Sequence, residues 1–138
     1  MATRKPRFVH HVGLQFESTQ PGQARCTLDV EDFHRNGTGV VHGGVLFTLA
    51  DTAMGGALYG SLDEGELCAT IEIKIGYFKP VFDRSLVCDA VLLNKGKSIA
   101  SLEATVHAGD VLVSKASGTF AIFRRKTDSQ IAEPLPEA

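Results

Sequence analysis

One carboxylate stands alone in an apolar stretch of this sequence. Residues 43–60 consist largely of glycine, alanine and larger apolar residues, and Asp51 is the one charged residue among them. An ionised carboxylate that leaves water without a partner costs more free energy than a folded domain can spare. We therefore expect Asp51 to be hydrogen-bonded by its neighbours or to take part in a reaction.

The residues directly before this stretch could hold a second charge. Residues 36–44 read Asn-Gly-Thr-Gly-Val-Val-His-Gly-Gly, so that an amide and an imidazole precede two glycines. If a helix begins there, its first turn presents unpaired backbone N–H groups and the positive end of the helix dipole. The amides of Gly43 and Gly44 could then stabilise a developing oxyanion, and their missing side chains would let a substrate oxygen approach. A carboxylate and an oxyanion-holding helix start together indicate acyl chemistry.

Composition limits the possible classes of protein. The chain has 138 residues, of which 43% are hydrophobic and 22% charged, and this is typical of one domain that buries a core. Its formal net charge of -2 argues against general binding to nucleic acid. Cys26, Cys68 and Cys88 lie far apart and outside any metal-ligand spacing. We therefore expect reduced core cysteines, no metal site and a cytoplasmic location.

Neither a signal peptide nor a membrane span is predicted. The charged start of the chain is not followed by an apolar region of the kind that a signal peptide needs. The apolar stretch at 43–60 is too short to cross a bilayer, and Asp51 interrupts it.

The remaining elements follow from the spacing of apolar residues. The stretch at 43–60 has the length and composition of a buried helix, whereas the alternation elsewhere is typical of strands. Near the middle of the chain, this alternation places Ile71 and Tyr77 on one face of a strand and Thr70 on the other. The predicted strands cover residues 23–31, 67–79, 85–94, 99–108 and 111–123.

A helix that is apolar on nearly all sides is best covered by a curved sheet. The small residues of the helix would let strands pack closely against it. We therefore predict the α+β class, with a curved antiparallel sheet wrapped around one long central helix. The chain divides into a single domain at 1–123 and a C-terminal tail at 124–138, whose prolines and carboxylates favour disorder.

The motif around Asp51 resembles that of a known enzyme family. Asn36, His42-Gly43-Gly44 and Leu49-Ala50-Asp51 match, in residue type and spacing, the signature of hotdog-fold acyl-CoA thioesterases of the phenylacetic-acid-degradation and thioesterase-superfamily-member type. The similarity covers nearly the whole predicted domain. It implies the hotdog fold and hydrolysis of an acyl-CoA thioester to a free acid and coenzyme A. No cofactor is implied, since coenzyme A is part of the substrate.

The resemblance implies a role for each matched residue. Asp51 falls on the family's catalytic carboxylate, Asn36 on its site asparagine, and Gly43 on the glycine whose N–H holds the oxyanion. His42 matches the histidine beside that glycine. Thr70 falls where the family often has a serine that holds the attacking water, so the hydroxyl is kept and a methyl group is added.

A second motif resembles a binding site for coenzyme A. Lys95-Gly96-Lys97-Ser98 is similar to the turn at which related enzymes contact the phosphates of coenzyme A. Lysine side chains on a backbone that glycine makes adaptable suit that task. The resemblance therefore implies that Gly96, Lys97 and Ser98 contact the substrate. Gly-Lys-Ser lacks the other glycine of a Walker loop and sits between strands, so it does not indicate an ATP site.

The chemistry and the substrate leave alternatives open. Asp51 could act as a general base on water or as a nucleophile that forms an anhydride. A hotdog-fold hydratase or dehydratase, and a non-catalytic acyl-CoA binding or regulatory module, are alternative functions. Aryl-acetyl, medium-chain and long-chain acyl groups would all suit a pocket with side chains such as Phe47, Met54, Leu58 and Tyr59.

The spacing of Gly43 and Asp51 predicts a site that two chains share. At about 1.5 Å rise per residue, the two residues are separated by about 12 Å on one helix, too far for both to contact one thioester carbon. Two antiparallel helices related by a twofold axis would bring Gly43 and Asn36 of one chain near Asp51 of the other. The resemblance implies such a homodimer as well, often paired again into a homotetramer.

Overall fold

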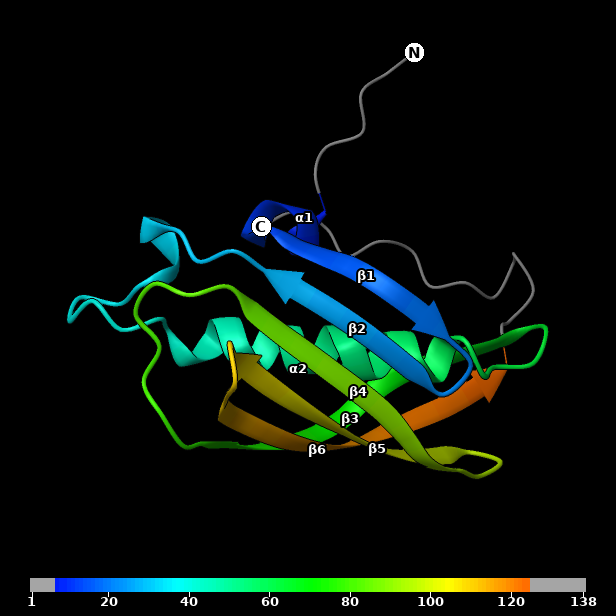
Figure 1. The fold of residues 1–138 in the computed structure, drawn as a ribbon. Helices are drawn as coiled ribbons and strands as arrows, with labels where there is room; N and C mark the ends of the chain where they lie inside the picture. The colour runs from blue at the N-terminus through cyan, green and yellow to red at the C-terminus, as the bar shows by residue number, and fades with distance from the viewer. Residues whose placement is uncertain (1–6, 125–138) are drawn as a thin grey trace, which may run out of the picture.

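A curved antiparallel sheet and one long helix form the fold (Figure 1). The computed structural model describes residues 7–124. The helices are α1 (Phe8–Val12), the 3-10 helix η1 (Asp32–His34) and α2 (Gly43–Tyr59). The strands are β1 (Leu14–Gln20), β2 (Gln23–Leu28), β3 (Glu66–Tyr77), β4 (Leu86–Lys95), β5 (Ile99–Ala108) and β6 (Val111–Arg124).

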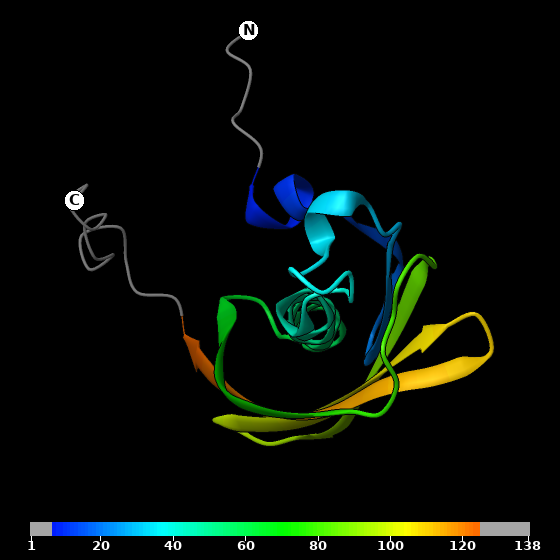
Figure 2. The same ribbon diagram turned by 90° about the vertical axis from the view of Figure 1, so that its left-hand side faces the viewer.

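The strands of residues 7–124 form a six-stranded sheet in which every neighbouring pair is antiparallel. Their order is β1-β2-β4-β5-β6-β3, so β3, which follows α2 in the chain, lies at one edge. Figure 2 looks along α2 and shows the sheet curving around the helix, with one side of the helix left without strands. The predicted α+β class and the wrapped central helix are confirmed.

One side of α2 forms the centre of the core. Its apolar side chains recur at every third or fourth position and are buried against the concave face of the sheet. Small residues allow the close approach: a Cβ at Gly118 of β6 would lie only 2.9 Å from the Met54 Sδ. The buried residues of α2 are Leu46, Leu49, Ala50, Ala53, Met54, Ala57 and Leu58.

The other side of α2 is open, although the sequence predicts a helix that is covered on nearly all sides. Thr48, Asp51, Thr52 and Gly55 are partly exposed there, and Tyr59 is exposed. Small and polar side chains have little apolar area to bury, so the packing leaves them at the surface. Asp51 is therefore not the deeply buried charge that its neighbours in the sequence predict.

The five predicted strands are all present, with ends that differ by a few residues. The strand predicted at 23–31 ends early, at Leu28. β1 is absent from the predictions because its residues after Phe16 are all polar and show no alternation. Its register with β2 also shifts, between Phe16 and Ser18. β1 also lies at the sheet edge, where it buries only Leu14.

A β-bulge in β3 reverses part of the predicted alternation. The register with β6 shifts between Thr70 and Glu72, which leaves Ile71 as an extra residue. Thr70 pairs directly with Phe120, and directly paired residues point to the same face. Phe120 is buried on the α2 side, so Thr70 also faces the helix. The prediction that put Ile71 on the same face as Tyr77, and Thr70 on the other, is wrong.

The predicted tail begins inside the last strand. β6 continues to Arg124, which pairs with Glu66 at the start of β3. The rest of the predicted tail lies outside the described residues, as do residues 1–6. Within residues 7–124, no helix is long and apolar enough to cross a membrane, and no cluster of three or more His, Cys, Asp or Glu could hold a metal ion.

Candidate active site

The open side of α2 carries Asp51 at the middle of the helix. The Thr70 hydroxyl donates a hydrogen bond of 2.7 Å to the Asp51 Oδ1. This bond depends on the bulge at Ile71, which turns Thr70 toward the helix. The Asp51 Oδ2 receives no hydrogen bond from the described residues. One carboxylate oxygen is thus held in place, and the other is available to accept a proton.

The start of α2 leaves one backbone donor unpaired. His42 is the N-cap residue, and its Nδ1 accepts a hydrogen bond of 2.8 Å from the Gly44 N–H. The Val45 N–H donates to the His42 carbonyl at 2.9 Å, and the His42 N–H donates to the His34 carbonyl at 2.8 Å. The Gly43 N–H has no partner within residues 7–124. The Gly43 amide, and not that of Gly44, is therefore available to an oxyanion.

Two aromatic side chains leave no room for a side chain at residue 43 or residue 44, which explains why both are glycines. The Tyr77 hydroxyl donates a 2.8 Å hydrogen bond to the Gly43 carbonyl, and a Cβ at Gly43 would lie 3.2 Å from the Tyr77 Cζ. A Cβ at Gly44 would lie 2.9 Å from the His42 Nδ1. Tyr77 is not among the site residues that the sequence predicts. Its contact with α2 joins residues 34 positions apart in the chain, and no short motif reveals such a contact.

The loop that carries Asn36 is held next to the start of α2. The Asn36 N–H donates to the Val40 carbonyl at 2.8 Å, and Gly39, with a φ of 88°, allows the tight turn between them. The Val41 N–H donates to the Val81 carbonyl at 2.7 Å, which ties the loop to the segment after β3. Backbone contacts thus fix the position of the asparagine.

A cavity of about 330 Å³ lies beside this loop and the start of α2. The Asn36 Oδ1 accepts hydrogen bonds from the Thr38 N–H at 2.9 Å and the Thr38 hydroxyl at 2.6 Å. The oxygen is therefore occupied, and the side-chain NH₂ group is left to donate to a ligand. The cavity is lined by Asn36, Val40, Val41, Gly43, Leu46, Tyr77, Phe78, Lys79, Pro80 and Val81.

The predicted catalytic residues form two separate groups within one chain. Asn36 and Gly43 share the cavity at the start of α2. Asp51 and Thr70 meet about 12 Å further along the helix axis, at a rise of about 1.5 Å per residue. One thioester carbon cannot contact both groups of the same chain.

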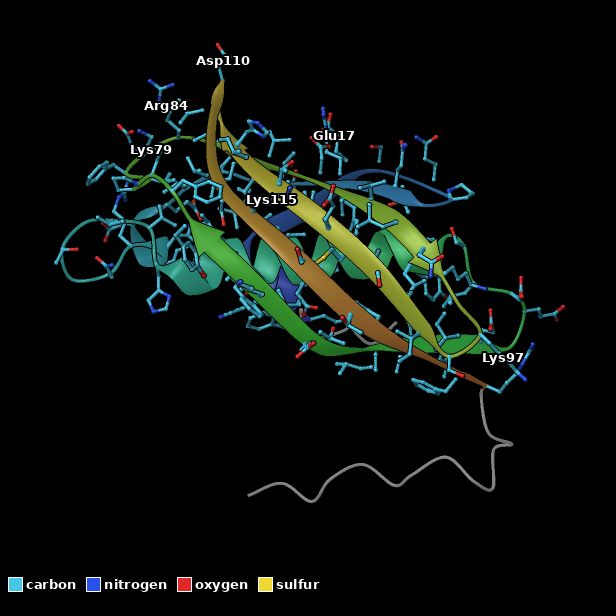
Figure 3. The ribbon with its side chains drawn as sticks, turned by 90° about the horizontal axis from the view of Figure 1, so that it is seen from below. Glu17, Lys79, Arg84, Lys97, Asp110 and Lys115 are labelled. Carbon is cyan, nitrogen blue, oxygen red and sulfur yellow. The ribbon has the colours of Figure 1, made fainter. Side chains whose placement is uncertain are left out.

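The turn between β4 and β5 presents Lys97 to solvent (Figure 3). Gly96 is required there, because its N–H donates to the Ile99 carbonyl at 2.8 Å and a Cβ would lie 2.9 Å from the same oxygen. Ser98 is exposed beside it. Lys97 forms no ion pair with any described residue. Figure 3 shows it at the opposite end of the molecule from Lys79, which lines the cavity at the start of α2.

An apolar groove of about 400 Å³ lies on the open side of α2 beyond Asp51. Gly55, one helical turn after Asp51, lines this groove, and a Cβ there would meet only Phe120 at 3.8 Å. The exposed rings of Phe16 and Tyr59 also line the groove. The full lining is Phe16, Thr19, Gly55, Gly56 and Tyr59.

The side chains predicted to line an acyl pocket are divided between the surface and the core. Tyr59 lines the groove, and Phe47 is 37% exposed on α2. Met54 and Leu58 are fully buried in the core, so they cannot line a pocket that a substrate reaches. The 3.6-residue period of the helix turns these two side chains toward the sheet.

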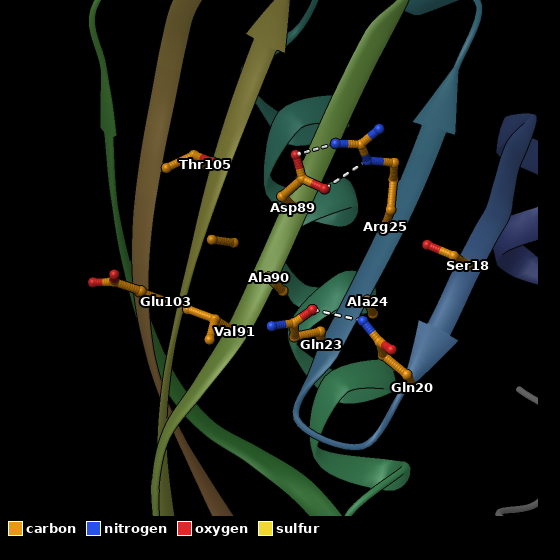
Figure 4. A pocket seen from close by; sticks show the side chains of 11 residues that line it. Ser18, Gln20, Gln23, Ala24, Arg25, Asp89, Ala90, Val91, Glu103 and Thr105 are labelled. Atoms are coloured by element: carbon orange, nitrogen blue, oxygen red, sulfur yellow. Dashed lines mark hydrogen bonds and ion pairs between the residues drawn. The ribbon is translucent and has the colours of Figure 1, made fainter.

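A further cavity, of about 440 Å³, lies over β1, β2, β4 and β5 on the face of the sheet away from α2 (Figure 4). Arg25 and Asp89 form a bidentate ion pair there, with N–O distances of 2.7 and 3.0 Å. Gln20 donates to Gln23 at 2.7 Å. These four polar side chains are thus bonded in pairs across neighbouring strands.

Burial keeps the cysteines as thiols. It raises the pKa of Cys26 to about 12. Desolvation also raises the pKa of Cys88, and it raises that of the less deeply buried Cys68. All three cysteines are free, as predicted. The raised pKa values do not favour a thiolate nucleophile at any of the three cysteines.

The curved sheet, the central helix and the carboxylate on the open side of that helix together define the hotdog class of enzymes that act on acyl groups. The chain matches the thioesterase superfamily over residues 38–115. It is 30% identical over 121 residues to acyl-coenzyme A thioesterase 13 of Homo sapiens, which covers 85% of this chain and 86% of that protein. The chain belongs to the thioesterase superfamily and is a thioester hydrolase.

Solved structures share this fold. A conserved protein from Pseudomonas aeruginosa superimposes with a TM-score of 0.80 at 37% identity, over 86% of this chain and 95% of that one. A mutant of the phenylacetic acid degradation protein PaaI from Thermus thermophilus superimposes with a TM-score of 0.76 at 27% identity, over 83% and 96% of the two chains. The predicted hotdog fold is confirmed.

Proposed function

We propose that this thioester hydrolase acts on acyl-CoA and releases a free acid and coenzyme A, with Asp51 as its catalytic carboxylate. The observation that carries the proposal is the hydrogen bond from Thr70 to Asp51 on the open side of α2. The bond orients the carboxylate and leaves one of its oxygens for water or for the thioester. Asp51 can then act as a general base or as a nucleophile.

In the general-base route, a water beside Thr70 gives a proton to Asp51 while its oxygen attacks the thioester carbon. The carbonyl oxygen becomes an oxyanion, which accepts a hydrogen bond from the Gly43 N–H. The NH₂ group of Asn36 donates to the thioester oxygen or to the water. The C–S bond then breaks, and the coenzyme A thiolate takes up a proton. In the nucleophilic route, an Asp51 oxygen attacks instead, and water hydrolyses the resulting anhydride.

Both routes require Gly43 and Asp51 of different chains. When two antiparallel α2 helices are related by a twofold axis, Gly43 of one chain is level with Asp51 of the other if the axis passes near Phe47, halfway between them. Along β3, Thr70 contacts Asp51 and Tyr77 contacts Gly43. The same axis therefore passes beside β3, level with a point between these two contacts.

The exposed edge of β3 supports this association. β3 is an edge strand, and such a strand offers its unpaired backbone groups to another chain. Ile71, Tyr77 and Phe78 at this edge are 53%, 50% and 52% exposed. Pairing two β3 strands would continue the sheet from one chain to the next and cover these apolar side chains. A further pairing into a homotetramer stays a prediction from the resemblance.

The rest of the substrate is assigned to two further features. The apolar groove beyond Asp51 suits the acyl group, because its lining includes just one aliphatic hydroxyl, that of Thr19, beside the phenol of Tyr59. Lys97, exposed and without an ion pair among the described residues, suits the phosphates of coenzyme A.

Free-thiol release from a panel of acyl-CoA thioesters tests the proposal. Asp51→Asn should lower kcat on the best substrate by about 10²-fold or more, the scale of a lost general base. The matched control is Asp89→Asn, which removes a carboxylate on the far face of the sheet and should leave turnover near that of the natural protein. A non-catalytic acyl-CoA binding module would release no thiol. Near-normal turnover by Asp51→Asn would remove Asp51 from the chemistry.

A further inference from the structure

The proposed oxyanion donor lies in a pliable part of the backbone. Gly43 and Gly44 form the first turn of α2, and each glycine favours a helix by about 1 kcal/mol less than alanine. Without a Cβ on either side, steric contacts hardly restrict the peptide that joins them. A rotation of this peptide would disturb the first turn of α2 and, through Gly43, the preceding peptide that carries the Gly43 N–H. Side-chain contacts help to hold the turn, and one of them comes from α2 itself, where the Thr48 hydroxyl donates a 2.8 Å hydrogen bond to the Gly44 carbonyl.

Two side chains bind the Gly43–Gly44 peptide at its two ends. The Tyr77 hydroxyl donates to the Gly43 carbonyl, and the Gly44 N–H donates to the His42 Nδ1, both at 2.8 Å. The C=O and N–H of a planar trans peptide point in opposite directions. A peptide that turned over would lose both hydrogen bonds at once.

The preceding peptide directs the Gly43 N–H. The His42 carbonyl accepts a hydrogen bond of 2.9 Å from the Val45 N–H, so it points into the helix. Because that peptide is also planar and trans, the Gly43 N–H points out of the helix start. The Tyr77 ring also limits how far the chain can move at residue 43, because its Cζ lies 3.2 Å from where a Cβ of that residue would be.

We propose that Tyr77 is a positioning residue of this thioester hydrolase, which acts through Gly43 by holding the first turn of α2 together with His42. The inference rests on the proposed function, in which the Gly43 N–H stabilises the oxyanion. Partial desolvation of this half-exposed side chain raises the pKa of Tyr77, so the phenol stays a hydrogen-bond donor at neutral pH. Tyr77 thus orients the donor without touching the reacting atoms.

Tyr77→Phe tests the proposal because it removes only the hydroxyl. We expect kcat to fall about 10-fold and KM to stay within about twofold, since transition-state alignment is lost and substrate contacts are kept. The matched control is Ser114→Ala: the buried Ser114 hydroxyl also donates a 2.8 Å bond to a main-chain carbonyl, that of Gly76. This control should lower the melting temperature at least as much and leave kcat within about twofold.

A second measurement does not depend on activity. In protein labelled with ¹⁵N-glycine, the amide signals of Gly43 and Gly44 should shift or broaden in Tyr77→Phe and stay in place in Ser114→Ala. The other side of the contact is tested by His42→Asn, which keeps an acceptor at the N-cap. It should retain more kcat than His42→Ala.

Each alternative gives a distinct result. An unchanged kcat in Tyr77→Phe, a higher KM with unchanged kcat, or an equal loss of kcat in Ser114→Ala would each overturn the positioning role. Unchanged glycine amides would overturn it even if the protein hydrolysed no thioester. Shifted amides in a protein that releases no thiol from any acyl-CoA would support the positioning of Gly43 and refute the proposed function.

Discussion

Mixing two inactive variants tests whether two chains share each active site. Asp51→Asn removes the proposed catalytic carboxylate, and Asn36→Ala removes the amide beside Gly43. In a mixed dimer, one shared site has both substitutions and the other has neither. Random association of equal amounts makes about half of the dimers mixed, and half of their sites are intact. A mixture that is unfolded and refolded together should therefore regain about a quarter of the natural thiol release.

The length of α2 sets this expectation. Gly43 and Asp51 lie about 12 Å apart along the helix axis, whereas an oxyanion donor must come within about 3 Å of the reacting oxygen. If all groups of one site came from a single chain, every chain in the mixture would carry a defect. Activity would then stay at the level of the two parent proteins.

The double variant Asp51→Asn, Asn36→Ala is the matched control. In a mixed dimer with the natural chain, one site lacks Asp51 and the other lacks Asn36, so both are inactive. When equal amounts of the natural chain and the double variant are mixed, activity before chain exchange is half of that of the same total amount of natural protein. After exchange it should be about a quarter. Native mass spectrometry verifies that mixed dimers form. If mixed dimers of Asp51→Asn and Asn36→Ala form but are no more active than the two parent proteins, the active site is not shared between chains.

Two further predictions concern the substrate. Lys97→Ala should raise KM for acyl-CoA with little change in kcat. This rise in KM should shrink as the salt concentration increases, because the contact with phosphate is one of charge. An equal rise in KM for a short thioester without the nucleotide would contradict this contact. Gly55→Leu should lower thiol release from a long-chain acyl-CoA about 10-fold relative to acetyl-CoA, by filling the apolar groove. The melting temperature of this variant should not fall, since a Cβ there meets only Phe120 at 3.8 Å and leucine favours a helix. If the ratio of thiol release from long-chain acyl-CoA to that from acetyl-CoA did not change, the acyl group would bind elsewhere.

Most of the fold could be predicted because its signals are local. A strand that buries one face alternates apolar and polar residues along its own sequence, and a buried helix is apolar over many consecutive positions. β1 could not be found in this way, because it is an exposed edge strand whose register shifts after Phe16. Its place in the sheet is decided by pairing with β2. The open side of α2 is likewise a result of how far the sheet curves.

In the candidate site, too, the residues with a local signal could be predicted and the contacts between distant residues could not. The motif identifies Asp51, Asn36 and Gly43 by residue type and spacing, and their catalytic roles stay predictions. The hydrogen bond that joins Thr70 to Asp51 contradicts the alternation of the strand, because it needs the bulge. The contact of Tyr77 with the start of α2 joins residues that are far apart in the chain. Neither contact leaves a pattern in neighbouring residues.

In the proposed dimer, the bulge in β3 lets one strand serve two active sites. Thr70 and Tyr77 are seven positions apart, and in a regular strand such residues point to opposite faces. The extra residue, Ile71, lets both face α2. In the proposed dimer, Thr70 serves the site that contains its own Asp51, while Tyr77 serves the other site through Gly43. Deleting Ile71 would turn one of these side chains outward, and the twofold symmetry would repeat that loss in both sites. In the proposed dimer, one inserted residue thus bears on two different parts of each site: the carboxylate, through Thr70, and the oxyanion donor, through Tyr77.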